Sequence, residues 1–428
     1  MSIRQLLLYA VCLANLSLAA QTIPAVRPAM AGTLSLAQVL EAAKLNAAAR
    51  ISQQDLAAAK SDILSANRAP LPTFSAKATD PANGSGSATG TGLPAGNLPR
   101  RTDKSLGLDW TYERGGKRAL RTEAAQLNAQ AAQAEYAETQ ILQQMIAKDL
   151  YFDLLSAQER TQHLNAIAVA AEATANSAKV RNKAGDLSAQ DMMRVEIDAE
   201  RAMSDYRKSL LDEKRASLNL IQSLSMASAQ TVVLSKDWPQ VSNMPLQQSQ
   251  SLNDWISGRP DVLAYQLRVQ ASQALLENAK ALGKIDPTIG VSVDSNPSTQ
   301  KRLTELRVQF PLQMKSTYDG EIGRASAQYF QAQTQWEQAK LNAEAEWQSM
   351  REAYATSMAR HTIYVQDILP RAQKVLAQAE LAYAKGAIPL VDLLDARRTL
   401  KTSLLEALEV QAEHAKTFTA LQLRAPKP

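Results

Sequence analysis

Four segments of the chain alternate apolar with polar or small residues. The clearest is the segment in which Leu106, Leu108, Trp110 and Tyr112 occupy every second position. Similar alternation runs through 289–294 and 306–313, and a weaker form through about 73–79. A period of two places all the apolar side chains on one face of a β-strand. The sequence therefore predicts two amphipathic β-hairpins, at about 71–114 and about 287–313. Their polar loops lie near 83–96, which is rich in Gly and Ser, and at 296–300.

Long stretches without helix breakers separate these hairpins. Residues 118–183 contain neither Pro nor Gly, and residues 321–369 contain only Gly323 and no Pro. A continuous helix over the first stretch would be ~95 Å long at 1.5 Å per residue. Small and apolar residues recur there at alternating steps of four and three, the spacing of a coiled-coil seam: Leu120, Ala124, Leu127, Ala131 and Ala134. Alanine at such positions allows neighbouring helices to approach closely.

The two halves of the chain resemble each other. Gly185 and Gly386 lie 201 positions apart (386 − 185), and Asp191 and Asp392 share that offset. Each glycine suits the end of a helix, because it adopts a positive φ without strain. A Pro-Thr pair opens each predicted hairpin, at 72–73 and at 287–288. We therefore predict a first repeat at 33–225, an irregular equatorial segment at 226–256, and a second repeat at 257–424.

Composition agrees with a mainly α protein that has a small β part. The 428-residue chain has only 5% aromatic residues and a formal net charge of +5. Its basic residues are spread along the chain and are not grouped with aromatic residues, which argues against a nucleic-acid partner.

The N-terminus has the features of an export signal. Arg4 precedes a run of apolar and small residues from Leu6 to Ala20, which is too short for a transmembrane helix. We predict a signal peptide at 1–20, with cleavage after Ala20 or as late as Ala31. Cys12, the single cysteine, lies inside it and is either discarded or lipidated. No later stretch of about 18 apolar residues follows, so entry into a membrane would require a closed β-barrel.

The chain lacks the residue patterns of an enzyme or a metal site. His163, His361 and His414 show no metal-binding spacing, and we interpret each as a histidine on a helix surface. Met192 and Met193 align with leucines of the other half, which favours core packing over a soft metal site. No nucleotide-binding loop or serine-nucleophile motif is present. The sequence therefore predicts no enzyme, no cofactor and no bound metal.

Four amphipathic strands are too few to close a barrel, which needs about eight. Open sheet edges in lipid would leave backbone groups without hydrogen bonds. If the strands enter a membrane, several copies must therefore share one barrel. The main alternative is a periplasmic coiled-coil adaptor or scaffold without a pore, although such a protein would not need two matching amphipathic hairpins.

One segment carries a specific resemblance. Residues 383–396, which read Tyr-Ala-Lys-Gly-Ala-Ile-Pro-Leu-Val-Asp-Leu-Leu-Asp-Ala, resemble the periplasmic turn of the TolC-type outer-membrane efflux family. The similarity extends from about Leu34 to about Leu423. It implies a long α-helical barrel joined to four strands per protomer, which contribute to a shared trimeric twelve-stranded β-barrel. Gly115-Gly116-Lys117-Arg118 resembles a feature of the heavy-metal efflux branch, although a basic strand-to-helix turn explains it equally well.

The resemblance also implies a gate at the helical tip. By it, Asp392 and Asp395 form acidic rings at the pore constriction, and Tyr383 belongs to links that hold the tip shut opposite Gln190 and Asp191. Because Asp392 and Asp395 are three positions apart, they share one helical face, and symmetric repetition would favour cations. A solvated acidic pair near a helix N-terminus is the alternative.

The function implied is a passive exit duct of a tripartite efflux system in the outer membrane, for metal cations or small toxic compounds. The implied partners are two further copies of the chain, a periplasmic adaptor, an inner-membrane pump and outer-membrane lipid. A duct for type I protein secretion is a further alternative.

Overall fold

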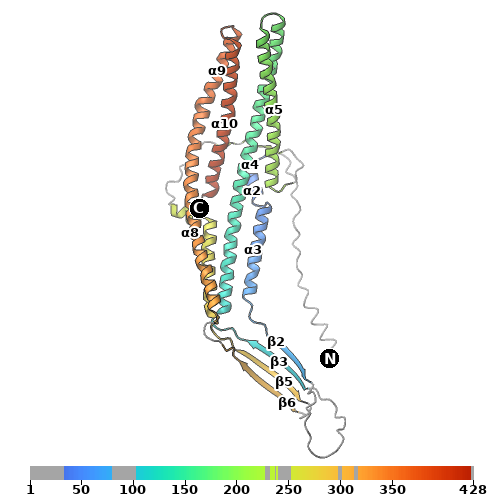
Figure 1. The fold of residues 1–428 in the computed structure, drawn as a ribbon, viewed down its shortest axis with the longest axis vertical. Coiled ribbons are helices and arrows are strands. Elements are labelled where there is room, and N and C mark those ends of the chain that lie inside the picture. Colours follow the sequence, from blue (N-terminus) through green and yellow to red (C-terminus); the bar gives the residue numbers. More distant parts are fainter. Residues whose placement is uncertain are drawn as a thin grey trace, which may run out of the picture.

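The computed structural model describes residues 33–79, 103–226, 232–236, 238–239, 252–296, 301–312 and 317–425. The predicted signal peptide, the predicted loop at 83–96 and residues 297–300 of the loop predicted at 296–300 lie outside these residues, whereas Asn296 belongs to a strand. Figure 1 shows an elongated molecule with a β-sheet at one end and two helical hairpins that extend to the other.

The first repeat runs from a short strand to a pair of long helices. Its elements are β1 (Thr33–Leu34), α2 (Leu36–Ala43), α3 (Ala47–Ala66), β2 (Thr73–Thr79), β3 (Asp103–Thr111), α4 (Lys117–Lys183) and α5 (Ala189–Ser223). The predicted order of helix, hairpin, long helix, turn and long helix is confirmed. A short segment follows, with β4 (Val233–Leu234) and α6 (Leu252–Ser257).

The second repeat has the same order. Its elements are α7 (Pro260–Ala281), β5 (Thr288–Asn296), β6 (Lys301–Gln309), α8 (Asp319–Ile363), the π-helix η1 (Tyr364–Ile368), α9 (Leu369–Ala384) and α10 (Leu390–Arg424). Pro260 occupies the first turn of α7, where its missing N–H costs no hydrogen bond. Strand β6 ends before Phe310 and Leu312, which the alternation had included, and Pro311 cannot donate to a further ladder bond.

Helix α4 explains the length of the molecule. It contains 67 residues without a break, which corresponds to about 100 Å. The predicted alanine seam is largely confirmed, because Ala124, Ala131 and Ala134 are buried. These small side chains let α4 pack closely against neighbouring helices along its length.

The π-helix η1 interrupts the second long helix, which the sequence predicted as regular. It immediately precedes the first turn of α9, where Pro370 lies. Proline removes the hydrogen bond that its N–H would give to the preceding turn, and a widened turn accommodates the loss. The helix of the second repeat that corresponds to α4 therefore consists of three consecutive segments, α8, η1 and α9, whereas α4 is continuous.

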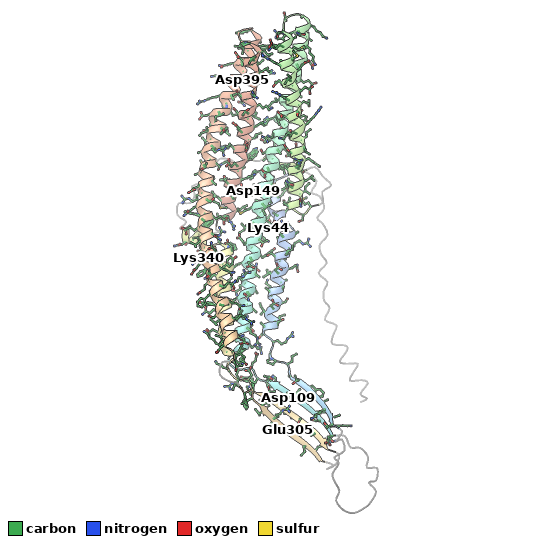
Figure 2. The ribbon with its side chains drawn as sticks, in the orientation of Figure 1. Lys44, Asp109, Asp149, Glu305, Lys340 and Asp395 are labelled. Carbon is green, nitrogen blue, oxygen red and sulfur yellow. The ribbon has the colours of Figure 1, made fainter. Side chains whose placement is uncertain are left out.

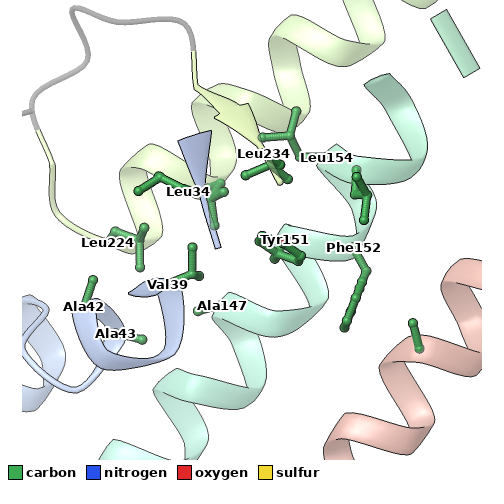
Figure 3. Packing of buried hydrophobic residues seen from close by; sticks show 13 residues of the cluster. Leu34, Val39, Ala42, Ala43, Ala147, Tyr151, Phe152, Leu154, Leu224 and Leu234 are labelled. Carbon is green, nitrogen blue, oxygen red and sulfur yellow. The ribbon is translucent and has the colours of Figure 1, made fainter. Parts of the chain in front are cut away.

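The largest hydrophobic cluster lies at mid-height, where the first repeat meets the equatorial segment. Tyr151 and Phe152 of α4 are fully buried there, and Phe152 stacks on Trp238 with 5.9 Å between ring centroids. Strands β1 and β4 pair in parallel beside them (Figure 3). The segment that the sequence predicted as irregular therefore contributes a strand and an aromatic side chain to the core.

Candidate functional site

The four long strands form one antiparallel sheet in the order β2-β3-β5-β6. The register places Leu108 opposite Phe74 on one side and opposite Val291 on the other, and Val291 opposite Leu306. These four side chains form one row across the sheet, and each is exposed in the single chain. Similar rows lie above and below it, so the predicted apolar face is present and uncovered.

The opposite face of the sheet is polar. Asp109 of β3 and Arg307 of β6 form a salt bridge of 2.7 Å across the intervening Gly290 of β5. A side chain at Gly290 would collide with the Asp109 carboxylate, so glycine is required for this bridge. Glu305 lies near this pair in the sheet (Figure 2).

A polar joint connects the sheet to the helices. Gly115 and Gly116 both have positive φ, and Gly116 precedes the first residue of α4. The Lys117 ammonium is buried and donates hydrogen bonds of 2.7 Å to Asp286 and to the Lys284 carbonyl oxygen. The Gly-Gly-Lys-Arg motif is thus part of a joint that ties the exit of the first hairpin to the entry of the second.

At the far end of the molecule, the two predicted glycine turns are confirmed. Gly185 and Gly386 have φ of 82° and 71°. In each turn a backbone hydrogen bond of the Schellman type closes the helix end: the Asp186 N–H donates to the Arg181 carbonyl, and the Ala387 N–H donates to the Ala382 carbonyl. The two hairpins contact each other here through a buried cluster that includes Ala175, Val195 and Leu390. Met192 packs against this cluster, as predicted, but Met193 is 51% exposed, so the packing interpretation is wrong for Met193.

Asp392 and Asp395 lie on one exposed face of α10. Both carboxylates are exposed, and neither forms an ion pair with any described residue. Asp392 lies in the first turn of the helix, and Asp395 is labelled near the tip in Figure 2.

Tyr383 contacts the neighbouring hairpin, but through a residue that the sequence did not indicate. Its hydroxyl accepts a hydrogen bond of 3.1 Å from Arg181 of α4, whose guanidinium also lies 5.7 Å from the ring centre. Asp191 instead contacts Ser188 and Arg194 on its own helix, and Gln190 is exposed. Within one chain, the structure therefore brings Tyr383 to Arg181 and does not bring it to Gln190 or Asp191.

A groove of about 790 Å³ lies between the α4–α5 hairpin and the α9–α10 hairpin, near their glycine turns. Two basic residues of α10 cross it: Arg397 donates to Thr174 of α4 at 2.9 Å, and Lys401 pairs with Asp205 of α5. Arg397 also lies 3.6 Å from Glu380 of α9, in its own hairpin. The sequence analysis missed these links. Arg397 and Arg398 both line the groove, but neighbouring arginines on one helix give no indication of which distant helix they will face.

One prediction about the histidines is wrong. His414 is only 3% exposed, and its ring lies 5.1 Å from that of His361 and 5.6 Å from that of Tyr354. Burial lowers the pKa of both histidines, and the neighbouring His361 lowers that of His414 further. The two residues are 53 positions apart, so spacing along the chain could not reveal that α8 and α10 bring them together.

Neither metal-binding clusters nor membrane-spanning helices are found in the described part of the chain. Among those residues, no three His, Cys, Asp or Glu side chains are grouped so as to hold a metal ion. No described helix has both the length and the apolar character needed to cross a bilayer.

Comparison with known proteins agrees with this architecture. Residues 252–424 match the family described as "Outer membrane efflux protein". This match covers the second repeat of the chain, and it confirms the resemblance to outer-membrane efflux proteins that the sequence indicated.

Similar proteins support the same assignment. The chain is 23% identical over 311 residues to the cobalt-zinc-cadmium resistance protein CzcC of Cupriavidus metallidurans, which covers 72% of this chain and 73% of that protein. A membrane protein from Pseudomonas aeruginosa has a TM-score of 0.74 at 17% identity, over 91% of this chain and 93% of the other. The outer membrane protein VceC of Vibrio cholerae has a TM-score of 0.72 at 16% identity, over 91% and 96%. These two structures share the fold of this chain.

Proposed function

We propose that three copies of this chain form a passive exit channel of a tripartite efflux system in the outer membrane. The exposed apolar face of the four-stranded sheet carries the proposal. An uncovered face of this kind, which includes Leu108, Val291 and Leu306, is unusual for a soluble protein and marks an interaction surface.

The edges of the sheet argue for a shared barrel. Strands β2 and β6 are the outer strands, and each pairs with only one neighbour in the single chain. In lipid, every backbone group without a hydrogen bond costs several kcal/mol. Pairing β6 of one copy with β2 of the next satisfies both edges, and three copies of four strands give a closed barrel of twelve.

In this barrel the two faces have distinct environments. The face with Val291 meets lipid, and the face with Asp109, Glu305 and Arg307 lines a wet lumen, which is the usual arrangement of membrane β-barrels. The helices continue the lumen into the periplasm and end at the glycine turns. A duct of this kind needs no catalytic residue, because an inner-membrane pump supplies the energy through a periplasmic adaptor.

The helical tip is the proposed gate. The carboxylates of Asp392 and Asp395 are exposed, and three symmetric copies would concentrate six of them around one axis. The contact between Tyr383 and Arg181 links the two hairpins of one copy and would restrain them in one arrangement. Gln190 and Asp191 lie on the facing turn, where they are available to a neighbouring copy.

Metal cations are the proposed cargo. An acidic constriction favours cations, and the resemblance to a cobalt-zinc-cadmium resistance protein supports this choice. Growth of a deletion strain on cobalt, zinc or cadmium salts, compared with growth on organic toxicants, tests it. Sensitivity confined to organic compounds would reassign the cargo.

A matched pair of substitutions tests the barrel. Val291→Lys places a charge on the proposed lipid face, where a lysine near the bilayer centre costs about 2–4 kcal/mol. Ser292→Lys places the same charge on the proposed lumen face, beside Glu305. We expect Val291→Lys alone to reduce the amount of trimer in the outer membrane. Equal trimer yields for the two variants would contradict the barrel and favour a scaffold without a pore.

A further inference from the structure

The apolar face of the sheet ends in a row with a different character. The register places Lys104 of β3 opposite Ser295 of β5, and Ser295 opposite Arg302 of β6. This row follows directly after the row that contains Leu106 and Val293, so all its members project from the apolar face. Neighbouring strands are about 4.8 Å apart, which puts the Lys104 and Arg302 backbones about 10 Å from each other.

Charges are sorted between the two faces of the sheet. Within strands β2, β3, β5 and β6, Lys104 and Arg302 are the only charged residues on the apolar face. The acidic residues of these strands all occur at positions of the opposite face: Asp103, Asp109, Asp294 and Glu305. Lys104 and Arg302 are exposed and form no ion pair with any described residue. Two cations therefore lie near each other with no acidic partner among the described residues.

The two ends of the apolar face differ. Trp110, Tyr112 and Phe310 lie at the end that adjoins the helices, and aromatic side chains favour the interface between lipid and water. Lys104 and Arg302 lie at the opposite end, which Figure 1 shows farthest from the helices. If the helices extend into the periplasm, the basic row lies at the level of the outer leaflet's headgroups.

We propose that Lys104 and Arg302 form a binding surface for the phosphate groups of the outer leaflet's phosphorylated glycolipid, lipopolysaccharide. The proposal rests on the proposed function, because it requires the apolar face to meet lipid. Each trimer would carry three such surfaces. Its consequence is that the channel has a lipid preference and a fixed height in the membrane.

The chemistry of the pair fits a phosphate-bearing headgroup. The planar guanidinium of Arg302 can donate two parallel hydrogen bonds to one phosphate, and the Lys104 ammonium adds a compact charge. Long basic side chains at a membrane boundary place their aliphatic stems against lipid and their charged ends at the headgroups. A zwitterionic headgroup offers the same phosphate with a neutralising cation beside it, and therefore attracts the pair less.

The test measures lipopolysaccharide retained by the full-length trimer after purification from outer membranes in a phosphate-free detergent. We expect the double variant Lys104→Gln/Arg302→Gln to retain several-fold less lipopolysaccharide per trimer than wild type. The single variants should show intermediate losses. The control Lys77→Gln removes a basic residue from the polar face, opposite Ser105, and should retain as much as wild type.

A second arm identifies the ligand group. Purified trimer is placed in phosphatidylcholine liposomes that contain either lipopolysaccharide or its enzymatically dephosphorylated form. Wild type should bind the phosphorylated lipid several-fold better, and millimolar inorganic phosphate should not displace it. Equal binding of the two lipids, or displacement by inorganic phosphate, would overturn the assignment to lipid phosphate.

Trimer mass and conductance in phosphatidylcholine bilayers separate this inference from the proposed function. A double variant that conducts as a trimer and retains as much lipopolysaccharide as wild type overturns the inference alone. A wild-type chain that forms no membrane trimer overturns both.

Discussion

Glu138 and Arg424 lie 286 positions apart in the sequence, yet one guanidinium nitrogen of Arg424 is 2.7 Å and 2.8 Å from the two oxygens of the Glu138 carboxylate. Both side chains are buried, at 12% and 5% exposure. Arg424 also contacts Glu346, which pairs with Arg259, which in turn pairs with Asp261. A connected group of charges thus joins α4, α7, α8 and the end of α10 in the interior.

We predict that Arg424→Met strongly destabilises the folded chain. It leaves the Glu138 carboxylate buried without its partner, and loss of one partner of a buried pair typically costs about 3–5 kcal/mol. Burial already raises the pKa of Glu138 although Arg424 acts in the opposite direction, which shows the cost of burying this carboxylate. Thermal unfolding, followed by the circular dichroism signal of the helices, should give a clearly lower melting temperature for the variant than for wild type.

The control for this prediction is Arg360→Met. Arg360 pairs with Glu413 at 2.5 Å, but both side chains are nearly half exposed. Exposed pairs contribute about 0–1 kcal/mol. Similar melting temperatures for the Arg424 and Arg360 variants would mean that the buried group of charges does not stabilise the fold.

A second prediction concerns the lumen charge set by Asp109 and Arg307. Asp109→Asn leaves Arg307 without its acidic partner, and Arg307→Gln leaves Asp109 without its basic partner. In the proposed trimer each substitution changes the lumen charge by three units, and the two changes have opposite signs. Reversal potentials across salt gradients should shift toward anions for Asp109→Asn and toward cations for Arg307→Gln.

The double variant is the matched control, because it removes both charges and restores the lumen charge. Its selectivity should return toward that of wild type. If both single variants shift selectivity in the same direction, the polar face of the sheet does not line the conducting path.

The local features of this fold could be predicted from the sequence. Alternation at Leu106 and Val291 identified strands and their faces, because the period of two is a local property of the backbone. Gly185 and Gly386 identified helix ends, because their positive φ disfavours other residues.

Contacts between distant helices could not be predicted. The links Glu138–Arg424 and Arg181–Tyr383 depend on how helices pack, and a single sequence has no period that joins positions so far apart. The π-helix η1 was missed because Pro370 lay just outside the uninterrupted stretch. The residues at the tip were assigned by resemblance to a family. That resemblance did not indicate Arg181, which is the residue that Tyr383 contacts on the other hairpin.

A third prediction follows from the buried histidine pair. The pKa of His414 lies below its ordinary value of 6.5 because of burial and the neighbouring His361. A histidine of this kind takes up a proton more readily in the unfolded chain. His414 should therefore have no effect on the free energy of unfolding above about pH 6.5. As the pH falls below this value, its contribution should lower the free energy of unfolding, and the decrease should end once the pH is below the folded-state pKa of His414.

The measurement compares melting temperatures at about pH 7.5 and about pH 5. His414→Phe should reduce the acid-induced loss, because Phe fits beside Tyr354 and Phe418 and does not titrate. His163→Phe is the control, since His163 is partly exposed on α4 and should leave the loss unchanged. Equal pH dependence in both variants would show that other groups control acid stability.

The last prediction tests the acidic gate. Asp392→Asn and Asp395→Asn together remove six carboxylates from the trimer without changing side-chain volume. If these residues line the constriction, the double variant should lose cation selectivity in planar bilayers, and divalent cations should block it less than wild type. Asp186→Asn removes an exposed carboxylate from the other turn and provides the control. Because Asp392 and Asp395 form no ion pair within the described chain, their removal should leave the melting temperature almost unchanged. Selectivity and block equal to those of wild type would instead identify the pair as a solvated surface feature, favoured only by its position at the start of α10.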